Sequence, residues 1–437
     1  MMETELICKV HKGFTSLWWD EFVSNTGNLE EHYVVESGLS EKEIENLNVV
    51  IEDVLKKAIK DKKNQDYLGV WKNGKQEARQ IEFLSDNPIG QQEGVKEWKE
   101  RVLKNDKLGL ILNNAESHSD ELSNIIMKYM SPYIEKYGFP VNGINTTIVA
   151  GDNEWDSLGI HKSSKGTYSL QINLSDFVKE AYVWTDEKIK ELGFNGEVIS
   201  ENFKEFIKNY SDKYSFSKGE IYSMSGNYAH TEKNNGFSVG LIIDINRLTE
   251  KELINNLWFK LGNELFSKNF TGDKATILPS YQEENHSEYI KKLLKGIRYR
   301  NIDTNQSIQD ALRICFLEHK LSLASNQGLQ TPPVVNTNTS YQEFKKALVN
   351  KSIVAANNCK ILCYEEKEHL YLFIRGRKFK MMQSEGVISI IKTLNEGECL
   401  SYSTLKENFF NGWGDEPVLM FLHLLFKNKG VKLQLSK

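Results

Sequence analysis

Apolar and polar positions over the first 142 residues follow mainly the period of a helix. In SEKEIENLNVVIEDVLKKAIK (40–60) the apolar residues recur at helical spacing, and Ser40 is a suitable N-cap. SDELSNIIMKYMSPYIEKYG (119–138) has the same spacing and ends on a glycine, as helices often do. LGLILNN (108–114) is typical of a strand. We therefore expect residues 1–142 to form an N-terminal region of helices and strands.

The pattern changes over residues 143–248, where short β-rich runs follow one another. Gly, Asn, Asp and Ser separate these runs, and one helical insertion is expected over about 186–213. Several short strands in succession predict a sandwich or a barrel. The runs are INTTIVAGD, GTYSLQINL, EAYVW, GEIYSMS and FSVGLIIDI.

Residues 249–326 return to helical patterning, in KELINNLWFKLGNELF, HSEYIKKLLKGI and SIQDALRICFLEHKLSLAS. Residues 327–340 contain glycine, two prolines and polar residues, which predicts a linker. Beyond it, residues 341–437 alternate helices with short strands, and this α+β pattern suggests a winged-helix-like domain. The expected fold class is α+β, with a β-rich core between helical segments.

Composition narrows the function classes. The formal net charge of −5 gives the whole molecule no electrostatic reason to bind nucleic acid. Residues 340–437 carry 15 Lys and Arg against 10 Asp and Glu, too modest an excess to predict specific nucleic-acid binding. The longest apolar stretch, at 417–426, is about half of a membrane span, so no membrane association is expected. Five scattered cysteines favour a reducing, cytoplasmic location.

Two histidines stand at chemically suggestive places in the β-rich region. His161 lies between a loop and a strand, and His230 follows 69 residues later, just before another strong strand. A β-barrel can place two such strands side by side, with both imidazoles in its mouth. Two histidines and one carboxylate suit a non-haem Fe(II) oxygenase. The alternative is that each histidine is simply a polar residue at a strand end.

The runs GIHKSSKGTYSLQINLSDFVKEAYVW and KGEIYSMSGNYAHTEKNNGFSVGLIIDI resemble the core of JmjC-type cupin oxygenases. The similarity covers about residues 105–437 and is strongest over 143–246. It implies a double-stranded β-helix (cupin/JmjC) at 143–248, a helical dimerisation region at 249–326 and the winged helix at 341–437. It also implies Fe(II) as the metal and 2-oxoglutarate as the co-substrate.

The resemblance assigns roles to residues at matching positions. His161 would be the first metal ligand and His230 the distal one. Lys179, 18 residues after His161, would hold the distal carboxylate of 2-oxoglutarate. A semi-buried lysine needs an anionic partner, which agrees with that role. Thr167 and Tyr168 are weaker candidates to line the same pocket.

One position departs from the family pattern. The family's acidic ligand stands two residues after the first histidine, where this chain has Ser163, a neutral and poor metal ligand. Three hypotheses remain open. An anion could fill the vacant position, as in related halogenases. Another carboxylate could replace it, either Glu232 or one of the loop acids Asp152, Glu154 and Asp156. The site could also have lost its chemistry.

The leading functional hypothesis is an Fe(II)- and 2-oxoglutarate-dependent oxygenase with an altered metal triad. Its substrate would be an amino-acid side chain of a peptide, a protein or a related small molecule. The competing hypothesis is a catalytically silent cupin that binds a partner or serves as a scaffold. The resemblance further suggests a homodimer formed through residues 249–326.

Overall fold

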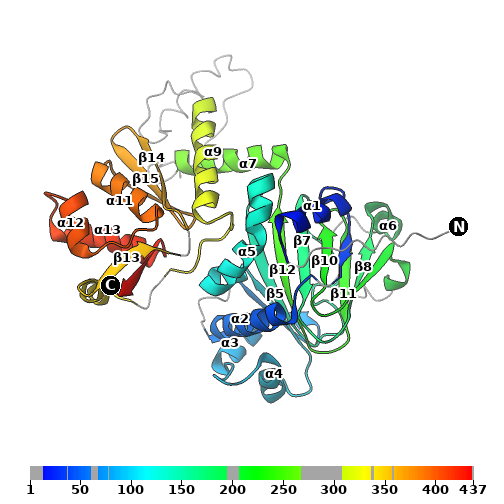
Figure 1. Cartoon of the computed structure of the whole chain (residues 1–437). Coiled ribbons are helices and arrows are strands. Elements are labelled where there is room, and N and C mark those ends of the chain that lie inside the picture. Colours follow the sequence, from blue (N-terminus) through cyan, green and yellow to red (C-terminus); the bar gives the residue numbers. More distant parts are fainter. Residues whose placement is uncertain are drawn as a thin grey trace, which may run out of the picture. The chain divides into compact units, whose positions relative to one another are not determined.

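The described part of the chain contains two compact units (Figure 1). One unit comprises Met1–Arg247 with Leu323–Lys437, and the other Leu248–Ser322. The helix expected at 286–297 lies outside the described residues. The computed structural model describes residues 13–36, 38–60, 67–76, 78–193, 206–266, 308–335, 339–356 and 359–435.

The first unit is built on two antiparallel β-sheets. Within the described residues, the larger sheet has the strand order β1 (Tyr33–Val35), β10 (Ile221–Ser225), β7 (Thr167–Asn173), β12 (Ser238–Asn246), β5 (Ile144–Gly151), β4 (Leu108–Asn113), β2 (Leu68–Lys72) and β3 (Lys75–Gln76). The smaller sheet has the order β6 (His161–Lys162), β11 (Ala229–Asn234), β8 (Lys179–Trp184) and β9 (Asp212–Phe216). Strand β9 begins where the sequence predicts the end of a helical insertion. The described helical parts of that insertion are α6 (Asp186–Glu191) and the 3-10 helix η4 (Ile207–Asn209).

Strands β5 to β12 define a double-stranded β-helix. Strands β5, β7, β10 and β12 belong to the larger sheet, and β6, β8, β9 and β11 to the smaller one. The first strand of the set, β5, pairs with the last, β12, over residues 144–151 and 238–245. This wrapping of one chain into two facing sheets is the jelly-roll arrangement of cupins. The α+β class and the cupin core expected from the sequence are therefore observed.

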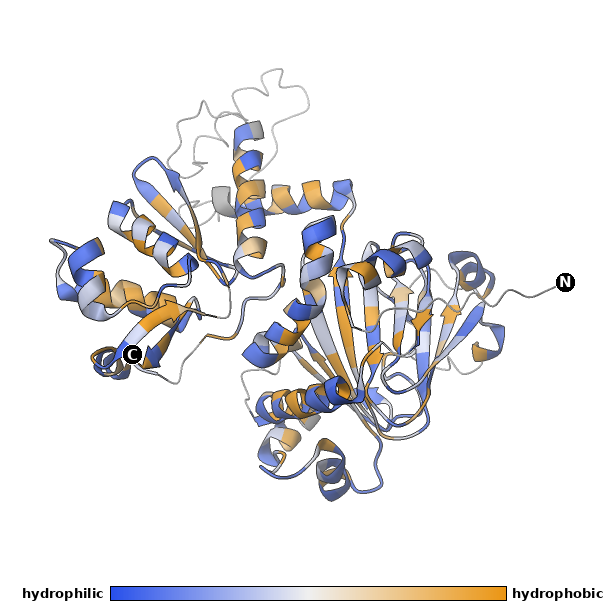
Figure 2. Cartoon of the chain, in the orientation of Figure 1, coloured by the Kyte–Doolittle hydropathy of each residue, from blue (hydrophilic) through white to orange (hydrophobic). Residues whose placement is uncertain are grey.

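Apolar and polar residues alternate along parts of the strands of the larger sheet (Figure 2). On β7, Tyr168, Leu170 and Ile172 belong to the main hydrophobic core, whereas Ser169 and Gln171 line a cavity. Helices pack on the outer face through the same core (Figure 1). They are α1 (Ser16–Asn25), α2 (Glu41–Lys60) and α5 (Asp120–Tyr137), with α3 (Ala78–Asp86), α4 (Val95–Leu103) and the 3-10 helix η2 (Ala115–His118) nearby in the chain.

Local signals explain where the two long helices begin and end. Ser40 and Glu43 form reciprocal hydrogen bonds at the start of α2, between the Ser40 amide and Glu43 Oε2 (3.0 Å) and between the Glu43 amide and Ser40 Oγ (3.4 Å). Ser119 accepts a hydrogen bond from the Leu122 amide at the start of α5. Gly138 ends α5 with a φ of 84°, a conformation that glycine adopts without strain.

Leu170→Ala is expected to reduce the free energy of unfolding by about 2–5 kcal/mol, because it opens a cavity in the core between the larger sheet and the helices. Leu170 is 0% exposed, whereas Leu17 on α1 is 50% exposed and provides a matched control. Urea unfolding followed by circular dichroism measures both variants. Equal, small effects for the two substitutions would contradict this placement of the core.

The remaining segments form separate hydrophobic clusters. Helices α7 (Glu250–Phe266) and α9 (Ile308–Ser325) pack through Leu257, Leu261, Ala311 and Cys315. The C-terminal segment has its own core, and its last strand, β17 (Val431–Leu435), pairs with its first, β13 (Lys351–Ala355), which lies between the first and second helices of the segment. Whether this segment is a winged helix stays a prediction. Its elements are α10 (Tyr341–Leu348), β13 (Lys351–Ala355), β14 (Leu362–Glu366), β15 (His369–Ile374), β16 (Arg377–Met382), α11 (Glu385–Asn395), α12 (Tyr402–Phe409), α13 (Asp415–Lys427) and β17 (Val431–Leu435).

Among the described residues, no helix combines the length and the hydropathy that crossing a bilayer requires.

Candidate metal and co-substrate site

His161 and His230 are direct cross-strand neighbours. Strand β6 pairs antiparallel with β11, and the register places His161 opposite His230. Residues directly opposite on antiparallel strands project to the same face, and the two ring centroids are 4.3 Å apart. Both side chains line a cavity of about 190 Å³ between the sheets. The pairing thus brings two residues 69 positions apart in sequence to one point.

The surroundings of the two imidazoles leave nitrogen atoms available for a ligand. His161 Nδ1 lies 3.2 Å from the Gly159 carbonyl oxygen, which assigns the proton to Nδ1 and a lone pair to Nε2. Asp156 Oδ2 is 3.9 Å from the same Nδ1. Among the described residues, the buried Nδ1 of His230 has no hydrogen-bond partner. Burial, with a smaller contribution from His161, holds the pKa of His230 well below its usual value, so this imidazole is neutral.

Lys179 extends into the same cavity from the first position of β8. Its side chain is buried, and the residue is 1% exposed. Its Nζ lies 3.9 Å from Glu232 Oε2 on the neighbouring strand. Burial lowers the pKa of Lys179, and the nearby Glu232 and Asp156 carboxylates oppose that shift. A Cβ on Gly240 of β12 would stand 3.0 Å from this Nζ, so glycine leaves room for the ammonium group.

Glu232 lies two residues after His230 and lines the same cavity. Gln171 Nε2 donates a hydrogen bond to Glu232 Oε2 at 2.6 Å. Burial raises the pKa of Glu232, and the attraction of Lys179 opposes the rise. Oε2 of this carboxylate is therefore held by Gln171 and lies beside Lys179.

Ser163, in the position of the family's acidic ligand, also lines the cavity. Of the loop acids considered as substitutes, Asp156 does so as well. Its backbone amide donates to the Glu232 carbonyl at 2.8 Å, which fixes the loop along β11.

The other two loop acids have partners elsewhere. Asp152 Oδ2 is 2.7 Å from Lys99 Nζ, and its Oδ1 accepts from the Leu108 amide. Glu154 pairs with Lys233 at 3.8 Å. Neither carboxylate contributes to the cavity wall, so Asp156 and Glu232 are the nearby acids among the candidates proposed from the sequence.

Thr167 and Tyr168, which the sequence suggested as pocket residues, are not among the residues that line the cavity. Tyr168 has the parity of the outer face of β7, where its ring joins the main core and its hydroxyl donates to the Glu31 carbonyl at 2.9 Å. Thr167 begins the strand, and its Oγ1 donates to Asn246 Oδ1 at 3.1 Å. Tyr168 therefore anchors an N-terminal loop instead of contacting a ligand.

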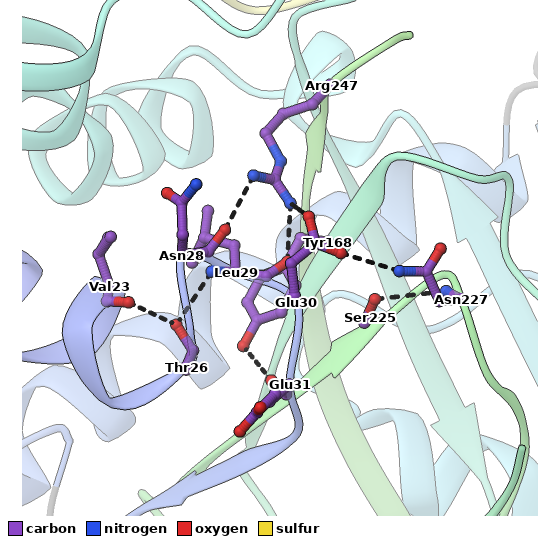
Figure 3. Close-up of polar contacts among 10 residues, drawn as sticks. All are labelled: Val23, Thr26, Asn28, Leu29, Glu30, Glu31, Tyr168, Ser225, Asn227 and Arg247. Carbon is purple, nitrogen blue, oxygen red and sulfur yellow. Dashed lines mark hydrogen bonds and ion pairs between the residues drawn. The ribbon is translucent and has the colours of Figure 1, made fainter.

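That loop, residues 26–31, is held against the end of the barrel by further polar contacts (Figure 3). Arg247 donates to the carbonyls of Asn28 and Leu29 at 3.0 and 2.7 Å, and Asn227 donates to Glu30 Oε2 at 2.8 Å. These contacts fix an outer surface of the barrel and do not enter its cavity.

Sequence reasoning missed several polar residues of the cavity wall, among them Ser169, Gln171 and Asp244. Ser169 Oγ donates to Asp244 Oδ1 at 2.6 Å, linking β7 to β12 inside the barrel. The signal that could have found them is period-two alternation. In TYSLQIN and SVGLIIDIN, polar residues occupy inward positions between apolar outward ones.

The donor set fits the histidine part of a non-haem iron site. His161 and His230 lie ring to ring, and a buried nitrogen of His230 has no partner within the described structure. The carboxylate part is absent, since no three His, Cys, Asp or Glu side chains of the described chain lie closely enough together to hold a metal ion. The cavity therefore presents two imidazoles that could serve as metal ligands, and further coordination positions would be left to other donors.

The sequence matches no protein-family model and, at a significant level, no curated protein. Among solved structures, YcfD, a ribosomal oxygenase from Escherichia coli, is similar over 95% of this chain and 98% of its own, with a TM-score of 0.45 and 12% identity. The YcfD complex with cobalt and 2-oxoglutarate gives the same values. Procruciferin, an 11S globulin from Brassica napus, has a TM-score of 0.19 and 7% identity over 32% of this chain and 26% of its own. The fold assignment rests on this chain's own strand order.

Proposed function

We propose that this protein is an Fe(II)- and 2-oxoglutarate-dependent oxygenase that oxidises an amino-acid side chain of a peptide, a protein or a related small molecule. The observation that carries the proposal is the His161–His230 pair in a cavity that also receives the buried ammonium of Lys179. Paired imidazoles suit a transition metal, and a buried cation suits an anionic co-substrate.

Each residue has a defined task in this proposal. His161 and His230 would hold the metal, and Lys179 would hold the distal carboxylate of 2-oxoglutarate. When bound, Fe(II) supplies the O₂ chemistry that couples decarboxylation of the keto acid to oxidation of a C–H bond. Asp156 and the Gly159 carbonyl orient His161 through its Nδ1, leaving Nε2 for the metal. The cavity lies between the two sheets, which would limit the access of water to the reacting groups.

A second candidate is a catalytically silent cupin that binds a peptide or a partner protein. It is favoured by Ser163 in the acidic position and by the engagement of Glu232 with Gln171 and Lys179. In that case the polar cavity would serve ligand binding alone.

Metal titration distinguishes the two candidates. Anaerobic Fe(II), or Mn(II) as its redox-stable substitute, should bind the wild-type chain, and His161→Ala and His230→Ala should each weaken binding. The loss should exceed the roughly 10–100-fold typical of removing a supporting second-shell partner. His369→Ala, on β15 of the C-terminal segment, is the matched control. A folded wild-type protein that binds neither metal would refute the oxygenase proposal and leave the binding candidate.

The homodimer expected through residues 249–326 belongs to the same proposal. Its support is a group of exposed apolar side chains on α7, namely Ile254, Trp258 and Phe259. Such side chains commonly mark protein interfaces.

A further inference from the structure

The charge of the Lys179 ammonium group is balanced by Glu232, but the ion pair does not use the hydrogen-bond donors of the ammonium group. It is buried, and an ammonium group carries three hydrogen-bond donors. Its ion-pair partner, Glu232 Oε2, lies 3.9 Å away, beyond hydrogen-bond distance. The pair therefore lessens the electrostatic cost of burying the lysine, while donor capacity remains for a closer anion.

Glu232 occupies the region that such an anion would enter. Both side chains line the cavity, and the register of β11 against β8 makes them diagonal neighbours on one face, since Glu232 lies opposite Ala181 and Asn234 opposite Lys179. An incoming carboxylate near Lys179 would therefore meet the charge of Glu232. Two carboxylates sharing one buried cation repel each other, so one of them must either move away or take up a proton.

Within the described structure, Glu232 is held on its other side by one side-chain amide, that of Gln171. Gln171 Nε2 donates to Glu232 Oε2, while the buried Gln171 Oε1 has no hydrogen-bond partner among the described residues. A buried polar atom without a partner is costly, so the amide that holds Glu232 is itself only partly satisfied.

We propose that Glu232 is a built-in counter-ion that occupies the anion-binding position at Lys179, so that a dicarboxylate enters the cavity only by displacing it. The identity of the dicarboxylate as 2-oxoglutarate rests on the proposed function. Glu232 thereby sets the affinity for this class of ligand. When no ligand is bound, Glu232 compensates the charge of the buried Lys179 ammonium group.

Glu232→Gln separates charge from shape, because glutamine keeps the volume and can still hydrogen-bond Gln171. We expect it to bind 2-oxoglutarate at least about tenfold more tightly than wild type, since the repulsion and the competition are both removed. Isothermal titration calorimetry of the full chain measures the affinity, once in the metal-depleted protein and once with Mn(II). Glu154→Gln, at a loop acid outside the cavity, makes the same chemical change and should leave the affinity unchanged.

Together with Glu232→Gln, the variants Lys179→Met and Lys179→Met/Glu232→Gln form a double-mutant cycle. Both should lose 2-oxoglutarate binding, because the gain from Glu232→Gln depends on Lys179. The double variant should also be more stable than Lys179→Met alone, which leaves a buried acid without its cation. If Glu232→Gln does not fold, Glu232→Asp shortens the carboxylate's reach and should bind more tightly than wild type by a smaller factor.

An equal or weaker affinity of a folded Glu232→Gln or Glu232→Asp variant would overturn the inference and make the pair purely structural. Absence of 2-oxoglutarate binding by folded wild type and Glu232→Gln, with or without Mn(II), would overturn it as well. Tighter binding by metal-depleted Glu232→Gln, together with no metal binding by any variant, would uphold the inference and refute the oxygenase. The two proposals therefore fail through different measurements.

Discussion

Lys179→Ala is expected to weaken 2-oxoglutarate binding by about 2–4 kcal/mol, roughly 30–1,000-fold. The ammonium is buried and faces a low-dielectric cavity, where a charge-assisted contact with a carboxylate is worth more than at a surface. Truncation removes the cation and leaves Glu232 as an unpaired buried acid that further disfavours an anionic ligand. Isothermal titration calorimetry gives the affinity directly.

Lys213→Ala is the matched control for this prediction. Lys213 lies on β9 of the same sheet, and its ammonium pairs with Glu180 outside the cavity. Loss of the Lys213 ammonium should leave the affinity for 2-oxoglutarate equal to that of wild type within experimental error. Unchanged affinity of the Lys179→Ala variant would show that another residue holds the co-substrate acid, or that no acid binds.

Ser163→Asp is expected to tighten Fe(II) or Mn(II) binding at least about tenfold. An ionised carboxylate two residues after His161, on the cavity wall, would supply the negative charge and the third ligand that the described residues lack. Uncoupled turnover of 2-oxoglutarate should rise with it if the rest of the site is intact. Anaerobic metal titration and succinate formation measure the two effects.

Ser164→Asp, at the next and exposed position outside the cavity wall, adds the same charge and should change neither quantity. A wild-type site that recruits an anion, as the halogenase-like hypothesis requires, should bind metal more tightly with chloride, and Ser163→Asp should lose that dependence. If Glu232 is the substitute ligand, Glu232→Gln should abolish metal binding. Failure of wild type and both cavity variants to bind metal would leave the protein as a scaffold.

Local sequence signals predicted the apolar strands and the capped helices because these elements bury one regular face. Strand β11, with the sequence AHTEKN, has no apolar alternation, since its inward residues are His230 and Glu232. It gains its order from pairing with β6 and β8, partners that no local pattern identifies. The absence of apolar alternation thus hid β11, the strand that carries His230 and Glu232.

The dependence on strand pairing also explains why some candidate residues lie in the cavity and Tyr168 does not. The histidines were selected by chemical type and position and Lys179 by the family resemblance, and the structure brings all three to one cavity. Tyr168 was selected by closeness to His161 in sequence, but strand parity turns its ring to the opposite face. The engagement of Glu232 with Gln171 depends on β7 facing β11 across the barrel, which is a tertiary relation.

The separation of the two faces of the larger sheet has an evolutionary consequence. The side chains that hold the barrel together face the helices, whereas those that face a ligand lie on the other side of the same strands. Substitutions on the cavity side, such as serine for an acidic ligand, remove little buried apolar surface and so cost little folding free energy. A barrel of this design can acquire, exchange or abandon an activity while its scaffold persists.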